Sequence, residues 1–311
     1  MDLRSLDLNL LLSLDALLQQ CSVSKAARQM GVGQPAMSSS LARLRRHFGD
    51  ELLARTGNRY LLTPLAMELQ GQVRTAVSGV ERVFAAGGGF DPRTTTREFS
   101  LIATDYAEAV LATAVADLLS RRAPHSRLRL AQPQLTAHPA RALNTGDTRM
   151  LGIDLVIMPH AFVTDLHHQD LYQDEWVCLV SADNKTVGPE LTTDDLRRLP
   201  WVVTFHSAAG TTQGMAGLQG QGVDPRVQMV TEHFLGLPGH VAGSDRIALL
   251  QRRLTDLLPP RPDLRILPCP VDAGSLNVAM WWHPVHDDDP VHTWFRELVR
   301  DAARTLKPLS T

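Results

Sequence analysis

The chain has 311 residues, 44% of them hydrophobic, and a formal net charge of −2. This length and composition suit two or three packed domains. No run approaches the ~18 uninterrupted apolar residues of a membrane span, and the acid-containing start MDLRSLDLNLLL does not fit a signal peptide. We therefore expect a cytoplasmic protein with no membrane partner.

The charge is divided unevenly along the chain. Residues 1–63 carry eight Lys or Arg against five Asp or Glu, a net charge of +3, which leaves −5 for residues 64–311. A small basic head on a larger acidic body is typical of a nucleic-acid-binding module joined to another domain.

The head begins with a leucine-rich stretch, residues 6–19, that predicts a supporting helix. Residues 24–48 then have the pattern of two short helices joined by a tight turn. We expect Ser24 to cap the first helix and Gly31 to end it. The second helix should begin near Gln34.

The second helix has one apolar side, on which Met37, Leu41, Leu44 and Phe48 recur at helical spacing. The opposite side is polar, partly basic and free of acids, as expected of a recognition helix in the major groove. An ordinary amphipathic helix pair is the alternative. The side chains expected to contact DNA are those of Ser24, Gln34, Pro35, Ser38, Ser39 and Arg43.

Two short apolar segments, residues 52–55 and 60–63, flank a Gly-Asn turn and predict a hairpin. A hairpin directly after a helix-turn-helix is a wing. Arg55 and Arg59 would reach phosphate or the minor groove, whose negative potential attracts arginine.

A long helix should follow from Pro64 to about Ala86. Its narrow apolar stripe comprises Leu65, Leu69, Val73, Val77, Val80 and Phe84. We expect the same helix of a second subunit to cover this stripe, and residues 87–89, three glycines, to form a flexible joint.

The rest of the chain alternates strands and helices, which predicts mostly parallel sheets covered by helices. Strands are expected at 99–104, 128–130, 154–158, 176–181, 201–205, 226–231, 246–250, 264–267 and 276–282. Helices are expected at 107–121, 139–144, 193–199, 212–219, 234–241, 253–258 and 290–306.

The head resembles the LysR-type transcriptional regulators. The matching positions are Ala26-Ala27, Gln34-Pro35-Ala36, Ser38, Leu41, Leu44, Leu52-Leu53-x-Arg55 and Leu62-Thr63-Pro64. The similarity extends over the whole chain. FSLIATDYAEAV, MWWHP and DDDPVHTWFRELV resemble the branch of nodulation regulators and regulators that respond to nitroaromatics and salicylate.

This resemblance implies an α/β fold with an N-terminal winged helix-turn-helix (1–63), a dimerising linker helix and hinge (64–92), and an effector-binding domain (93–311). The last would be a periplasmic-binding-protein-like sensor of two subdomains, one formed by 97–163 and 271–311 and the other by 164–270. The implied partners are double-stranded operator DNA, a small-molecule effector, a homodimer or homotetramer, and RNA polymerase.

The sequence departs from the family pattern at several positions. Gly33 stands where a Ser cap is frequent, and Arg45 replaces a common Glu. Ser39 stands where many members have Arg or Asn, and a serine reads bases less specifically. We therefore expect Gln34 and Arg43 to dock the helix on the DNA backbone as much as they read bases. Residues 146–152 form a longer loop than the family pattern has.

In a two-lobed sensor of this kind, a ligand lies at strand ends between the lobes. Hydroxyls, imidazoles and aromatic rings at these ends favour a small aromatic or carboxylate-bearing effector. The candidate effector-binding residues are Thr104, Asp105, Phe205, His206, Ser207, His233, Phe234, Arg246, Ile247 and His283.

No catalytic motif or cofactor-binding motif is present, so we expect no enzyme activity and no cofactor. His283, His286 and residues 287–289 lack the spacing of a metal site. His160, His167 and His168 are expected in exposed loops. No metal site is therefore expected.

Two other interpretations of the chain remain. One is a redox-responsive regulator of the same fold that uses Cys178 and Cys269, although Cys178 lies in an apolar run and is expected to be a buried thiol. The other is an α/β ligand-binding or enzymatic protein whose head serves only for oligomerisation.

Overall fold

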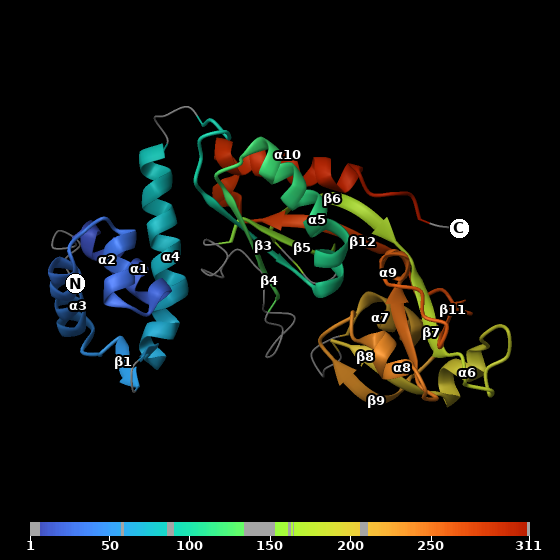
Figure 1. Cartoon of the computed structure of the whole chain (residues 1–311). Helices are drawn as coiled ribbons and strands as arrows, with labels where there is room; N and C mark the ends of the chain where they lie inside the picture. Colours follow the sequence, from blue (N-terminus) through green and yellow to red (C-terminus); the bar gives the residue numbers. More distant parts are fainter. Residues whose placement is uncertain are drawn as a thin grey trace. The chain divides into compact units, whose positions relative to one another are not determined.

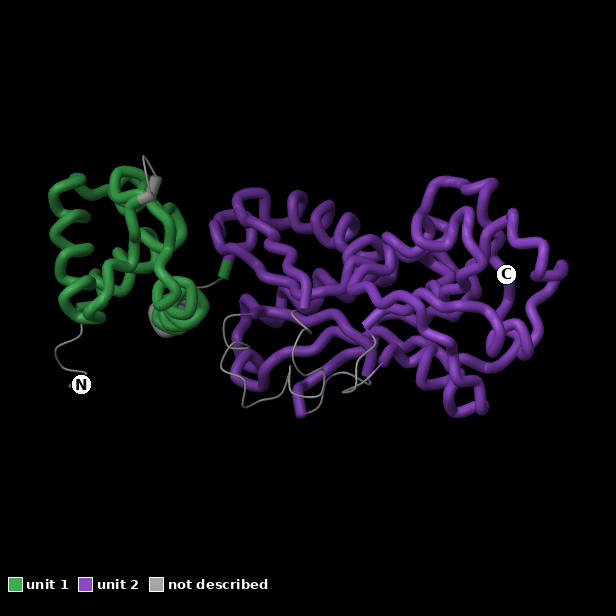
Figure 2. The backbone as a smooth tube through the Cα atoms, turned by 90° about the horizontal axis from the view of Figure 1, so that it is seen from below, with its two compact units in different colours: residues 1–90 green, residues 91–311 purple. Residues whose placement is uncertain are grey.

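The computed structural model describes residues 7–56, 59–85, 90–133, 153–160, 163, 165–205 and 211–309. The chain forms two compact units, residues 1–90 and residues 91–311 (Figure 2). The helix expected at 139–144 lies outside the described residues. Among the helices that are described, none is long and apolar enough to cross a membrane.

The first unit begins with three helices around one apolar core (Figure 1). They are α1 (Leu8–Gln20), α2 (Val23–Gln29) and α3 (Gln34–Phe48). The Ser22 hydroxyl accepts a backbone N–H of the first turn and caps α2. The expected cap at Ser24 is therefore wrong, because α2 starts at Val23 and Ser24 lies inside its first turn. Gly31 has the positive φ of 65° expected for the residue that ends this helix.

The expected hairpin follows α3. It comprises β1 (Leu53–Thr56) and β2 (Arg59–Leu62), paired antiparallel. Asp50 holds its base: Oδ1 accepts the Leu52 N–H and the Thr63 hydroxyl, both at 2.6 Å. Thr63 in turn accepts the Ala66 N–H at 3.1 Å and caps α4. One carboxylate thus ties the start of the hairpin to the cap of α4.

The long helix α4 (Pro64–Ala85) packs on α1 of the same chain. Val73 and Val77 are buried in the core that α1 shares, and the Gln70 side-chain amide donates to the Leu18 carbonyl at 3.4 Å. The expectation that a second subunit covers the whole stripe is therefore wrong for these valines. Residue spacing shows that a face is apolar but does not show which neighbour covers it.

The second unit contains two five-stranded sheets (Figure 1). The first lobe has the strand order β4-β3-β5-β12-β6 and the helices α5 and α10. Its elements are β3 (Glu98–Ala103), α5 (Asp105–Arg122), β4 (Arg127–Ala131), β5 (Leu155–Pro159), β6 (His167–Asp174), β12 (Leu276–Trp282), the 3-10 turn η5 (Pro284–His286) and α10 (Pro290–Arg304).

The second lobe has the strand order β11-β7-β10-β8-β9. Its elements are β7 (Trp176–Ser181), α6 (Thr193–Arg198), β8 (Pro200–Thr204), α7 (Gln213–Gly220), β9 (Arg226–Thr231), α8 (Leu237–Val241), β10 (Ile247–Gln251), α9 (Arg252–Leu257) and β11 (Leu264–Pro268).

Both sheets are mixed, so the expectation of mostly parallel sheets is wrong. β3 is parallel to β4 and β5, and β8 is parallel to β9 and β10. The pairs β12–β5, β12–β6, β7–β10 and β7–β11 are antiparallel. The antiparallel strands include those that connect the lobes: β6 leads directly into β7, and β12 follows β11.

The sequence did not predict β6, and His167 and His168 lie in this strand rather than in a loop. Its sequence HHQDLYQD is polar because it forms an edge of the sheet and exposes much of its surface. It pairs with β12 from Trp282 to Leu276. The chain therefore leaves the first lobe after Asp174, not near residue 164 as expected.

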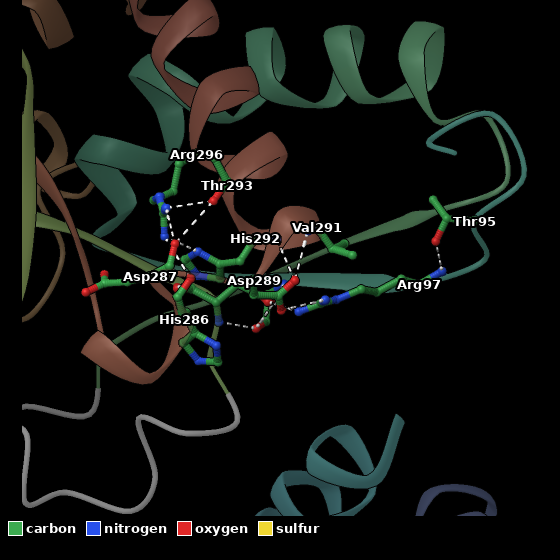
Figure 3. A network of polar contacts seen from close by, with 11 residues as sticks. Thr95, Arg97, His286, Asp287, Asp289, Val291, His292, Thr293 and Arg296 are labelled. Atoms are coloured by element: carbon green, nitrogen blue, oxygen red, sulfur yellow. Dashed lines mark hydrogen bonds and ion pairs between the residues drawn. The ribbon is translucent and has the colours of Figure 1, made fainter. Parts of the chain in front are cut away.

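A polar network joins the first sheet to the start of α10 (Figure 3). Arg97 Nη2 lies 2.5 Å from Asp154 Oδ1, and Arg97 Nη1 lies 3.7 Å from Asp289 Oδ2. The other Asp154 oxygen accepts the Ser100 N–H at 2.7 Å. Asp154 is buried, and each of its carboxylate oxygens accepts a hydrogen bond.

His292 occupies the centre of this network (Figure 3). Its Nε2 lies 2.8 Å from the Asp154 carbonyl oxygen, which can only accept, so Nε2 carries the proton. Its Nδ1 then accepts from Arg296 at 2.9 Å, and its ring stacks on that of His286 at 4.6 Å between centroids. Burial lowers the pKa of His292, which favours this neutral form.

Candidate functional site

The recognition helix α3 has the two faces that its sequence predicts. Met37, Leu41 and Leu44 are buried in the core of the first unit. Its exposed side chains include all those expected to contact DNA from this helix: Gln34, Pro35, Ser38, Ser39 and Arg43. Gly33 supplies no side-chain cap, so the start of α3 keeps backbone N–H groups free for an anion such as phosphate.

The arginines of α3 have different surroundings. Arg43 forms an ion pair with Asp7 at 3.1 Å, and both side chains are partly exposed to solvent. Arg45 donates to the Glu51 and Leu53 carbonyls, so it connects α3 to the wing. Arg46 is exposed, and no described carboxylate lies in ion-pair range of it. It is therefore a further exposed cation on this helix.

The remaining DNA candidates lie beside α3 in the fold of the first unit. Ser24 is exposed in the first turn of α2, and Arg55 is exposed on β1, opposite Tyr60. Arg59 begins β2, and its side chain lies outside the described part of the chain.

A cavity lies between the two lobes of the second unit. Side chains from both lobes line it, and none of the described ones is charged. They are Thr104, Tyr106, Ala107, Ile157, Met158, Pro159, Leu276 and Val278 of the first lobe, and Trp176, Phe205, Thr212, Gln213, Phe234 and Gln251 of the second. Aromatic rings and aliphatic groups make most of this wall.

Three polar atoms at this cavity are buried and have no hydrogen-bond partner among the described residues. They are Trp176 Nε1, a donor, and Gln213 Oε1 and Gln251 Oε1, both acceptors. Buried polar groups in folded proteins are nearly always paired. Unmatched groups beside an apolar space are therefore available to a ligand.

The position of the Trp176 ring depends on a glycine of α7. A Cβ built at Gly214 would lie 2.7 Å from Trp176 Cδ2, closer than any normal contact. The indole therefore packs directly on the α7 backbone. At Gly220, in the same helix, a Cβ would meet nothing within 4 Å.

Three of the expected effector residues line this cavity: Thr104, Phe205 and Phe234. The Thr104 hydroxyl also accepts the Ala107 N–H and caps α5. Phe205 has an unusual positive φ of 50° at the end of β8. His206 and Ser207 lie outside the described residues.

Five expected effector residues do not line the cavity, and each has another environment. The Asp105 carboxylate accepts the Leu235 N–H at 2.8 Å and so connects the lobes. Arg246 is held by the Gln228 side chain and the His240 carbonyl. Asp105 therefore lies between the lobes but outside this cavity, and Arg246 is engaged within the second lobe.

The other three expected effector residues also lie in environments outside the cavity. Ile247 is fully buried in β10. His233 is exposed, and His283 accepts the Val285 N–H at 3.1 Å. Sequence reasoning missed Trp176 and Gln251 instead. Gln251 was detectable as a polar residue at the end of a strand that is otherwise apolar.

Two cysteines of the second lobe are neighbours: Cys178 of β7 and Cys269, directly after β11. Cys178 is buried in β7, as expected, and pairs with Leu267 of β11, two residues before Cys269. The Cys178 thiol donates to the Cys269 sulfur, which lowers the pKa of Cys269 to about 7. The same contact and burial raise the pKa of Cys178.

Comparison with known proteins identifies both units. Residues 8–67 match the bacterial regulatory helix-turn-helix protein, lysR family, and residues 92–304 match the LysR substrate binding domain. Nodulation protein D 3 of Rhizobium leguminosarum bv. phaseoli is 32% identical over 307 residues, 98% of this chain and 99% of that protein. Nodulation protein D 1 of Rhizobium meliloti (strain 1021) is 30% identical and covers 100% of this chain and 99% of its own.

Solved structures agree with this fold. A probable transcriptional regulator from Pseudomonas aeruginosa is 25% identical, with a TM-score of 0.75 over 96% of this chain and 98% of that one. CbnR, a LysR family transcriptional regulator, was solved in complex with its target DNA; it is 14% identical, with a TM-score of 0.61 over 96% of this chain and 100% of its own. The chain thus belongs to the LysR family of bacterial transcriptional regulators, which join a DNA-binding helix-turn-helix to an effector-binding domain and are not enzymes.

Proposed function

We propose that this regulator responds to an uncharged aromatic effector that binds in the cavity between its lobes. The proposal rests on one observation. The wall of the cavity is mostly apolar, but it includes three buried polar atoms without a described hydrogen-bond partner, on Trp176, Gln213 and Gln251. The indole N–H would donate to a carbonyl or ether oxygen of the effector. The amide oxygens would accept from a hydroxyl.

A carboxylate-bearing effector, which the sequence also favoured, has less support. No Lys, Arg or His is among the described residues that line the cavity. Burying a carboxylate without a cation is costly. Arg246, the one arginine among the candidate effector residues, is engaged with Gln228.

The proposed response to the effector is a change in the position of one lobe relative to the other. The Tyr106 ring of α5 lies 6.1 Å from the Phe234 ring between centroids, and Asp105 accepts the Leu235 N–H. An effector between Thr104 and Trp176 would change these contacts. Because coupling between two sites is reciprocal, operator DNA should also change effector affinity.

On the DNA side, we propose docking through α3 and the wing of residues 1–63. Gln34, Pro35, Ser38, Ser39 and Arg43 would enter the major groove, and Ser24, Arg55 and Arg59 would contact the flanking backbone. We further propose a cytoplasmic homo-oligomer. It would dimerise through residues 64–92, and its effector domain would span residues 93–311.

Two matched compounds test the effector class. Methyl 4-hydroxybenzoate and 4-hydroxybenzoate share a ring, a hydroxyl and a carbonyl, but only the second is an anion. We expect the ester to raise the melting temperature of the full chain, since bound ligand adds about 2.7 kcal/mol at a hundred times Kd. A shift with the acid alone would contradict the proposal.

Ser39→Ala tests the docking on DNA. Because serine reads bases weakly, we expect operator affinity and the operator-to-random ratio to change less than threefold in fluorescence anisotropy. Arg43→Ala should weaken binding to both DNAs and lower the salt dependence. A large loss of discrimination in Ser39→Ala would show direct readout at this position.

The cysteine pair supports a second candidate, a redox-responsive regulator. Its support is the contact between Cys178 and Cys269 and the lowered pKa of Cys269. Replacing both cysteines by serine separates the candidates. An effector-type regulator keeps its ligand response in this variant, whereas a redox regulator loses its response to oxidant.

A further inference from the structure

Three side chains with metal-binding chemistry meet on one face of the first sheet, outside the effector cavity. They are His160, directly after β5, and His168 and Asp170 of β6. One possible ligand atom from each lies within 4.8 Å of the others. Nothing in the spacing of 160, 168 and 170 along the chain identifies this group as a site.

Strand register brings these residues together. β12 lies between β5 and β6, and its Ala279 pairs with Met158 on one side and Asp170 on the other. His160 directly follows β5, two residues after Met158, and its ring contacts those of Trp281 and His168 on this face. The small side chain of Ala279 leaves space between the outer strands. His160 Nε2 and Asp170 Oδ1 thus approach to 2.6 Å.

An aromatic ring orients the two imidazoles. The Trp281 indole lies 4.6 Å from the His168 ring and 5.1 Å from the His160 ring, between centroids. The two imidazoles are 4.8 Å apart and nearly perpendicular. Trp281 is itself fixed, because its Nε1 donates to the Met158 carbonyl at 2.9 Å. The site therefore has a rigid base of sheet and indole.

We propose that His160, His168 and Asp170 form a Zn²⁺-binding site, with water as the fourth ligand. Two imidazoles and one carboxylate are a donor set that Zn²⁺ prefers, while Mg²⁺ and Ca²⁺ prefer oxygen ligands alone. Bonds of roughly 2.0–2.2 Å to Zn²⁺ require ligand atoms between about 3 and 4 Å apart. Small rotations of the side chains bring the observed separations into this range.

The site is open to solvent and adjoins the cavity. The side chains of His160 and Asp170 are 36% and 73% exposed, so a hydrated ion reaches them without unfolding. Met158 and Pro159, which line the cavity, end β5 directly before His160. Zn²⁺ would therefore bridge the end of β5 to β6 beside the effector. The competing explanation is an exposed His–Asp pair, which contributes little to stability by itself.

Zinc binding to the full chain tests this site. Cys178→Ser/Cys269→Ser is the background, since it removes the neighbouring thiols of Cys178 and Cys269 as a competing site. Equilibrium dialysis with Zn²⁺ should give one ion per chain. His168→Asn and, separately, Asp170→Asn should weaken binding at least tenfold, while His125→Asn, an exposed histidine outside the group, should leave it unchanged. Co²⁺ in place of Zn²⁺ should give the visible absorption of a four-coordinate site.

Two results would overturn the proposed zinc site. One is equal Zn²⁺ affinity of His168→Asn and its background. The other is no binding of Zn²⁺ to the background at micromolar concentration. Both altered residues are exposed, so the variants should fold, and circular dichroism checks this. The test requires neither effector nor DNA.

Discussion

The network around Asp154 and the cavity between the lobes both hold polar atoms away from water, but they differ in how those atoms are paired. Around Asp154, each carboxylate oxygen has a donor, and both nitrogens of His292 are engaged. In the cavity, Trp176 Nε1 and Gln251 Oε1 have no described partner. Paired groups of this kind stabilise the fold, whereas unpaired buried groups in the wall of a cavity are candidates for binding a ligand.

The largest expected effect follows from breaking the paired network. Asp154→Ala leaves Arg97 and the Ser100 N–H without their acceptor. Removing one partner of a buried ion pair costs about 3–5 kcal/mol, so urea unfolding of the second unit should shift to much lower midpoints. Asp245→Ala, at an exposed site, is the control and should stay within about 0.5 kcal/mol. Equal losses in both variants would show that the network does not carry stability.

A smaller effect is expected from filling the wall of the cavity. Gly214→Ala forces the Trp176 ring to move, because its new Cβ would lie 2.7 Å from Cδ2. Overpacking of this kind costs about 1–3 kcal/mol and should weaken effector binding roughly tenfold in calorimetry. Gly220→Ala, where nothing lies within 4 Å, is the matched control. If both variants bind alike, the indole position is unimportant.

The pH dependence of stability should be smaller again. Burial lowers the pKa of His292 below 6.5 in the folded protein, so the unfolded chain binds more protons in acid. The stability of the second unit should therefore fall as the pH drops below about 6.5. Protonation would also abolish the bond that Nδ1 accepts from Arg296. His292→Asn should lose this dependence, and His125→Asn should keep it.

The two units differ in how much of their structure the sequence predicts. In the head, helical spacing and turn residues specified α3, the wing and the core positions Met37 and Leu41, since these patterns are local. The cap of α2 was placed at Ser24 instead of Ser22 because two serines stand near the same helix start. Contacts that need tertiary structure, such as Asp50 with Thr63, left no local pattern.

In the second unit, most strands were predictable because their residues are apolar, but β6 was not. An edge strand with the sequence HHQDLYQD has the composition of a loop. The same limitation affected the candidate site. Strand ends suggested Arg246 and His283, whereas the register and packing that place Trp176 and Gln251 at the cavity depend on residues far away in sequence.

Gln251→Met tests most directly whether unpaired polar atoms mark the effector site. The substitution removes a buried acceptor without a partner and keeps a similar volume. We expect the melting temperature without effector to stay the same or rise, because an unsatisfied buried group costs about 1–3 kcal/mol. We also expect the shift caused by methyl 4-hydroxybenzoate to shrink strongly. A lower melting temperature, together with an undiminished shift on adding the ester, would contradict the assignment of this cavity as the effector site.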